Sequence, residues 1–186
     1  MQNTPLTVRY NMKKQLIIAI IATISFNLSA QNSKTQSSHS IKGPVFGLSY
    51  SYEHPIAKES TLNMELIFNG GFGSGVFYDS YWVVAPALRI EPRYYYNLTK
   101  RFDKGKKTIN NSANYLAFAA DYQPGISVGK NMEAIQYLQI VPKYGLKRTI
   151  GQHFIFEVAA GVGTYIAMKK NWEAVLAIDL KFGYAF

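Results

Sequence analysis

The sequence has no cysteine, few acidic residues and no long apolar run beyond its N-terminal region. The absence of cysteine excludes a disulfide framework and any metal site built on thiolates. Because no uninterrupted apolar stretch of about 18 residues follows the N-terminal region, the chain is not a polytopic helical membrane protein. Only 11 Asp and Glu stand against 20 Lys and Arg, which gives a formal charge of +9 over 186 residues, a length that fits one domain.

Aromatic residues, in contrast, are abundant: they make up 15% of the chain, with 14 Tyr and 11 Phe. Intrinsically disordered chains are poor in aromatics, so this composition indicates a folded domain. The mean hydropathy of −0.07 conceals this aromatic content. The positions of the aromatic residues are therefore more informative than the average.

The N-terminal segment has the layout of a secretory signal peptide. Lys13 and Lys14 precede a mostly apolar stretch over residues 16–28, and Ala30 is a small residue suited to the cleavage site. We expect Met12 to be the initiator, residues 1–30 to be removed, and residues 31–42 to form a flexible leader. A buried helix in the mature domain is the alternative, but the stretch has no amphipathic period. Removal takes away three basic residues and no acid, which leaves the mature chain at +6.

From residue 45 onward the dominant pattern is an alternation of apolar and polar residues, which is typical of β-strands with two different faces. Each run is about long enough to cross a bilayer when tilted, which takes about 9 to 11 residues. Seven runs are readable, over residues 46–53, 61–69, 82–98, 116–123, 137–147, 154–166 and 172–186.

The two faces of these runs differ in a way that favours a membrane. One face is apolar with almost no charge, whereas the other mixes Gly, Ala and Ser with isolated ionisable residues. A soluble sandwich or barrel also alternates, but its outward face is charged. The pattern predicts an all-β fold, an antiparallel up-and-down transmembrane β-barrel of about eight strands. The eighth strand comes either from residues 31–42 or from a break within Gly70 to Gly75 that splits one run.

Charged residues on the polar face are expected to fill the interior of the barrel as a network of paired side chains. A gated or ion-selective passage through the same residues is the alternative. The predicted interior charge network consists of Glu65, Arg89, Glu91, Arg93, Asp121, Lys143, Glu157, Asp179 and Lys181.

Aromatic residues on the apolar face gather near the ends of successive runs, where amphipathic rings can lie at the level of the lipid headgroups. This concentration on one face favours a membrane boundary over ordinary packing. The residues are Tyr50, Tyr52, Tyr94, Tyr96, Tyr122, Tyr144, Tyr184 and Trp172.

The C-terminal run from Leu180 to Phe186 has an apolar residue at every second position and ends on an aromatic one. It resembles the closing strand of bacterial outer-membrane β-barrels. The region around Ala30 and the stretches 91–101 and 111–115 also resemble segments of small uncharacterised outer-membrane barrels of the Bacteroidetes. The similarity to this group covers most of residues 43–186. The resemblance implies that the barrel assembly machinery reads Phe182, Tyr184 and Phe186, and it brings no catalytic residues.

If the last strand runs toward the periplasm, residues 148–152 form a periplasmic turn and residues 129–133 an outer loop. Residues 97–114 then face the periplasm as well, and they carry much of the basic excess. This basic loop is either a solvated connector or a surface for lipid phosphates or an acidic periplasmic partner. It contains Lys100, Arg101, Lys104, Lys106 and Lys107.

The three histidines are far apart in sequence and show no metal-ligand spacing, so we expect neither a metal nor a cofactor. A lipid-modifying barrel enzyme would need a His with a nearby Ser or acid, and His54 with Ser51, Glu53 or Ser60 is the candidate set.

The overall expectation is a monomeric, non-enzymatic barrel in the bacterial outer membrane, with a closed polar interior and a structural or envelope-related role. Its partners are outer-membrane lipids and the assembly machinery, and nucleic acid is excluded by export. The alternatives are a narrow pore, a lipid-modifying enzyme and a soluble periplasmic barrel that carries a lipid.

Overall fold

The fold is taken from a computed structural model, which describes residues 34–44, 47–75, 78–167 and 171–186. The predicted signal peptide and its cleavage site lie outside the described residues. No helix in the described part of the chain is long and apolar enough to cross a membrane.

Eight antiparallel strands form a closed barrel, in which the first strand pairs with both the second and the last. The expected all-β barrel of eight strands is thus confirmed. Its strands are β1 (Ser38–Pro44), β2 (Gly47–Ala57), β3 (Ser60–Gly75), β4 (Tyr78–Tyr94), β5 (Asn114–Pro124), β7 (Gln136–Ile150), β8 (Phe154–Ala167) and β9 (Glu173–Ala185). A short strand, β6 (Val128–Lys130), pairs with the outer part of β4 beyond the ring.

The eighth strand is β1, which settles the two possibilities for it. The expected flexible leader over residues 31–42 is therefore wrong for residues 38–42. In β1, Ser38, Ser40 and Lys42 are buried in the barrel while Ile41 is exposed outside. The pattern is weak in the sequence because its inward positions are polar and Ile41 is its one aliphatic outward residue.

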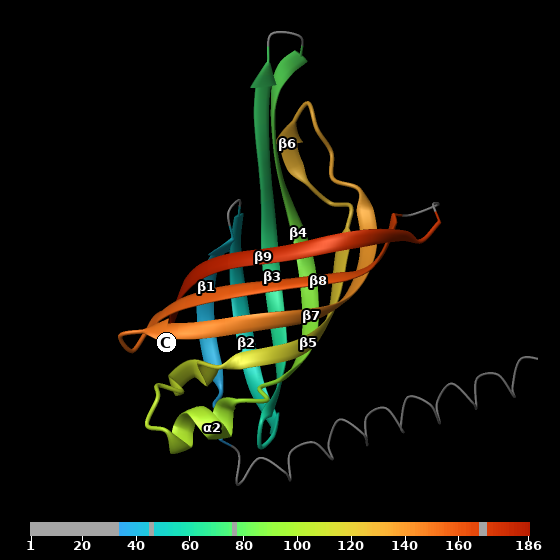
Figure 1. Cartoon of the computed structure of the whole chain (residues 1–186). Coiled ribbons are helices and arrows are strands. Elements are labelled where there is room, and N and C mark those ends of the chain that lie inside the picture. Colours follow the sequence, from blue (N-terminus) through green and yellow to red (C-terminus); the bar gives the residue numbers. More distant parts are fainter. Residues whose placement is uncertain (1–33, 45–46, 76–77, 168–170) are drawn as a thin grey trace, which may run out of the picture.

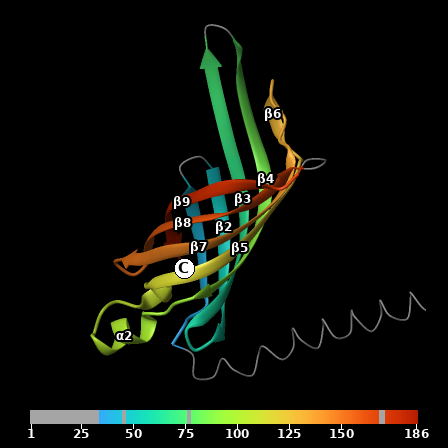
Figure 2. The ribbon, with the colours of Figure 1, turned by 45° about the vertical axis from the view of Figure 1, so that its right-hand side comes forward.

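The glycine-rich segment Gly70 to Gly75 contains no break. It continues β3 and pairs with β4 from Gly70, opposite Val84, to Gly75, opposite Tyr78, with a shift of register between Gly73 and Gly75. Several strands are longer than the expected 9 to 11 residues, up to 17 in β4. As Figures 1 and 2 show, the β3–β4 hairpin extends far beyond one end of the ring, with β6 beside it.

The opposite end of the barrel carries a short helix, α2 (Leu98–Asp103), and a 3₁₀ turn, η3 (Ile109–Asn111). Figure 1 shows this segment at the lower end of the barrel. The Nζ of Lys107 donates to the carbonyl of Gly151, 2.6 Å away, so the 97–114 loop and the 148–152 turn do share one end of the barrel. The expected alternation through Leu98 is wrong, because Leu98 lies in α2 and is buried.

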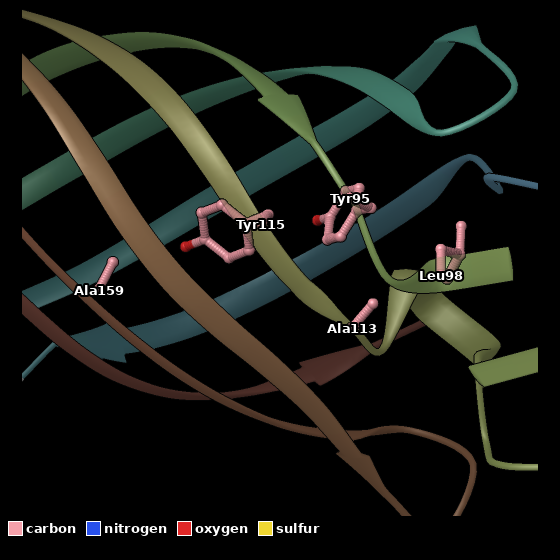
Figure 3. Packing of buried hydrophobic residues seen from close by; sticks show 5 residues of the cluster. All are labelled: Tyr95, Leu98, Ala113, Tyr115 and Ala159. Atoms are coloured by element: carbon pink, nitrogen blue, oxygen red, sulfur yellow. The ribbon is translucent and has the colours of Figure 1, made fainter. Parts of the chain in front are cut away.

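The apolar core is small and lies next to this helical end. Figure 3 shows its five residues, with the ring of Tyr115 inside the barrel and that of Tyr95 close to it. Their ring centroids are 5.4 Å apart. The cluster consists of Tyr95, Leu98, Ala113, Tyr115 and Ala159. The remainder of the interior is mainly polar, and its contacts define the candidate site.

Candidate functional site: the interior charge network

The structure brings all nine predicted interior charges together inside the barrel and adds three that were not predicted. The additions are Lys42, Glu53 and Lys147, each about 1% exposed. Salt bridges of 4.0 Å or less connect all twelve side chains into one network, which we call the interior network. It contains six acidic and six basic residues, so its formal charges cancel.

Arg89 on β4 is the centre of one half of the interior network. It stands opposite Glu65 of β3 and Asp121 of β5 in the strand register, so both neighbours present a carboxylate to it. Its Nε and Nη2 donate to the two carboxylate oxygens of Asp121 at 2.6 and 2.8 Å. Its Nη1 donates to Asp179 at 2.9 Å and lies 4.0 Å from Glu65. A forked guanidinium suits this arrangement because it donates in several directions at once.

Arg93, also on β4, is the centre of the other half. Its Nε donates to Glu91 and its Nη2 to Glu157, both at 2.6 Å. Its Nη1 lies 3.9 Å from Glu53, and the guanidinium stacks 4.6 Å above the ring centroid of Tyr115. Arg93 therefore joins three carboxylates near the Tyr95–Tyr115 pair.

Four lysines complete the interior network. Lys143 links its two halves, because its Nζ lies 2.8 Å from Asp179 and 3.9 Å from Glu91. The other three each neutralise one carboxylate: Lys181 pairs with Glu65 at 2.7 Å, Lys42 with Glu157 at 2.9 Å, and Lys147 with Glu53 at 2.7 Å.

Neutral polar groups satisfy further lone pairs of the carboxylates. The hydroxyls of Tyr95 and Thr61 donate to Glu53 at 2.6 and 2.7 Å, and that of Tyr115 donates to Glu157 at 2.7 Å. Burial, together with the charge of Glu53, raises the pKa of Tyr95 well above its ordinary value. The phenol thus stays protonated and keeps donating.

The interior network fills the interior of the ring with ordered charge. All twelve side chains are at most 7% exposed except Asp179, at 18%. A charge removed from water is costly unless it is paired and hydrogen-bonded, and here each one has a partner. Chemically, the arrangement pairs the interior charges and connects side chains of opposite strands, as Arg89 of β4 and Asp179 of β9 do.

The alternation in the sequence could have placed two of the three additional residues inside the barrel, but not the third. Glu53 and Lys147 occupy polar-face positions of readable runs, so the alternation could have placed them inside. Lys42 could not be found in this way, because it lies in the segment taken for a leader.

The wall of the barrel separates His54 from Ser51 and Glu53, two of its three candidate catalytic partners, whereas Ser60 lies on the outer side, as His54 does. Nδ1 of His54 is hydrogen-bonded to the Tyr52 hydroxyl, 3.0 Å away. Ser51 and Glu53 instead point inside, where the Ser51 hydroxyl donates to Asn63. Adjacent residues on a strand face opposite sides, so this His cannot activate this Ser. Among the described residues, no cluster of three or more His, Asp or Glu is placed to hold a metal ion.

The predicted assembly residues lie on the outside of β9 and just beyond its end. Phe182 is 60% exposed, Tyr184 45% and Phe186 64%. The backbone N–H of Phe186 donates to the carbonyl of His39, which ties the C-terminus to β1. The eight aromatic residues predicted to lie at the membrane boundary are all more than a third exposed, except Tyr52, which is half-buried.

No family model, curated protein or solved structure matches the chain. The resemblance to small Bacteroidetes barrels thus stays a prediction from the sequence.

Proposed function

We propose that the protein is an integral outer-membrane β-barrel with a closed polar interior, which acts as a non-enzymatic structural component of the envelope. The observation that carries this proposal is the reversed placement of charged and apolar side chains. Eleven ion pairs lie inside the ring, whereas the outward positions carry exposed aliphatic and aromatic residues.

The outer surface supports a lipid environment. Leu88, Leu176 and Ile178 are 55, 66 and 69% exposed, and they lie on strands β4 and β9, on opposite parts of the sheet order. Monomeric soluble proteins rarely expose contiguous apolar patches larger than a few hundred Å². A bilayer, in contrast, requires an apolar band around a barrel.

The interior argues against two alternatives. A soluble carrier of a hydrophobic ligand needs an apolar cavity, whereas this interior holds twelve charged side chains in one network. A passage for ions needs a continuous aqueous path, and the Arg93–Tyr115 stack together with Tyr95 occupies the helical end of the ring. These two properties of the interior support a structural role over a carrier or a pore.

Membrane fractionation tests the location. We expect the protein in the outer-membrane fraction, with faster migration on a detergent gel before heating than after. Recovery in the soluble periplasmic fraction would overturn the proposal.

Planar-bilayer recording tests the closed interior. We expect no channel events above background from the wild-type protein. A matched variant, Arg93→Ala with Tyr115→Ala, removes the stacked pair and is expected to increase ion leakage. Regular conductance steps from the wild-type protein would contradict a closed interior.

A further inference from the structure

The charges outside the interior network are distributed unevenly between the two ends of the barrel. At the end with α2, eight basic residues accompany only two acidic ones, Glu59 and Asp103. At the end with the β3–β4 hairpin, the described charged residues are one basic residue, Lys130, and three acidic ones, Asp79, Glu133 and Glu173. Because the interior network is neutral, the basic excess of the described residues lies at the α2 end.

The two acids at this end are already engaged. Asp103 pairs with Lys34 at 3.2 Å, and a carboxylate oxygen of Glu59 accepts the backbone N–H of Thr99 at 3.2 Å. Lys100, Lys104 and Lys106 make no ion pair with any residue that the structure describes. Their charge is consequently available to an external anion.

These lysines surround a pocket of about 420 Å³ that also includes a fixed guanidinium. Arg101 donates from Nε to the carbonyl of Ser112 at 2.8 Å and from Nη2 to that of Lys107 at 3.1 Å. Its Nη1 has no hydrogen-bond partner among the described residues. The basic pocket, as we name it, is lined by Tyr96, Asn97, Lys100, Arg101, Lys104 and Lys106.

One wall of the basic pocket belongs to the outer surface of the barrel. The hydroxyl of Tyr96 lies 3.0 Å from that of Tyr144, an outward residue of β7, and the amide of Asn114 donates to both at 3.1 and 2.9 Å. Arg148 donates to the carbonyl oxygen of the same Asn114 side chain. Tyrosine hydroxyls of this kind mark the boundary between apolar and polar layers of a membrane.

We propose that the basic pocket binds the phosphate of an anionic phospholipid in the periplasm-facing leaflet. This inference rests on the proposed membrane location and orientation. Tyr96 and Tyr144 are placed at the headgroup level, and Lys104 and Lys106 reach the phosphate from the aqueous side. Guanidinium and ammonium donors are the usual partners of phosphate oxygens.

Native mass spectrometry of the full chain tests the proposal in micelles that contain equal amounts of phosphatidylglycerol and phosphatidylcholine. We expect phosphatidylglycerol to be retained preferentially. The variant Lys104→Gln with Lys106→Gln should reduce that preference roughly thirtyfold, given the usual attraction of about 1 kcal/mol per basic residue near an anionic surface.

A matched control removes the same charge elsewhere. Lys58→Gln with Lys130→Gln changes two exposed lysines outside the basic pocket, only one of them at the α2 end, so it should reduce the preference clearly less than the pocket variant does. An equal loss in both double variants would show attraction by net charge alone and would overturn the pocket. Equal retention of the two lipids by the wild-type protein would also overturn it.

Two further arms distinguish other sources of phosphate. Displacement of phosphatidylglycerol by millimolar inorganic phosphate, or a preference for lipid A over phosphatidylglycerol, would each contradict a site for the periplasmic leaflet. Flotation with phosphatidylcholine vesicles separates this inference from the proposed function. A protein that floats without preferring phosphatidylglycerol refutes the basic pocket alone, whereas one that does not float refutes the membrane location.

Discussion

The interior and the exterior of the barrel are built from the same strands, yet they depend on opposite interactions. Inside, carboxylates and cations such as Glu157 and Lys181 face each other across neighbouring strands. Outside, residues such as Ile178 are exposed and make few polar contacts. In a soluble protein a charge is tolerated outside and an apolar residue inside. This barrel should respond to substitution in the reverse sense.

The largest expected effect comes from removing a central cation of the interior network. Arg93→Met leaves three carboxylates short of a partner, because Arg93 contacts Glu53, Glu91 and Glu157. We expect a loss of about 3–5 kcal/mol in the free energy of unfolding, the usual cost of an uncompensated buried charge. Urea unfolding of the barrel in lipid vesicles measures it.

The matched control for Arg93 is Lys42→Met, which removes a cation that serves only Glu157. Glu157 keeps the Arg93 bond, so the loss should be clearly smaller than that of Arg93→Met. Equal losses would show that the interior network does not depend on its central arginines.

A charge on the outside should be nearly as harmful as a missing charge inside. Ile178 lies near the middle of β9 and is 69% exposed. Ile178→Lys should cost about 2–4 kcal/mol if this position faces the centre of a bilayer. The control Ser80→Lys, on the exposed β3–β4 hairpin, should change stability little. If Ile178→Lys left the free energy of unfolding unchanged, water and not lipid would cover the strand.

Small residues inside should resist enlargement even when no charge changes. Gly145 of β7 stands opposite Tyr115 in the register, and a Cβ built on it would overlap the Tyr115 phenol ring. Gly145→Ala should displace that ring and cost about 1–3 kcal/mol. Gly105→Ala is the comparison without steric overlap, because no atom lies within 4 Å of its added Cβ. Its φ of 64° adds backbone strain to that variant.

The smallest expected effect is the loss of one neutral donor from the interior network. Tyr95→Phe removes the hydroxyl that donates to Glu53, while Thr61 and Lys147 still satisfy this carboxylate. We expect a loss of roughly 1–2 kcal/mol. Tyr94→Phe, which alters an exposed residue next to it, should leave the free energy of unfolding unchanged.

The sequence predicted most of the barrel because a period of two is a local property. Phe154, Phe156 and Glu157 reveal their faces from spacing alone, and a strand fixes which side chains share a side. The same reasoning failed for residues 38–42. Their inward positions are polar as in the other strands, but of the outward residues His39 and Ile41 only Ile41 is aliphatic, so the contrast between the two faces is weak.

The sequence alone determined the strand type, the apolar outer side and nine of the twelve interior charges. The tertiary structure decided which charges meet. Arg89 and Asp179 are 90 positions apart, and they pair only because the ring closes and brings β4 and β9 around one interior. It also decided that the connector after β4 folds back as α2 and places Leu98 in a buried cluster. Alternation records the side of the sheet on which a residue lies, whereas closure and register determine its neighbour across the barrel.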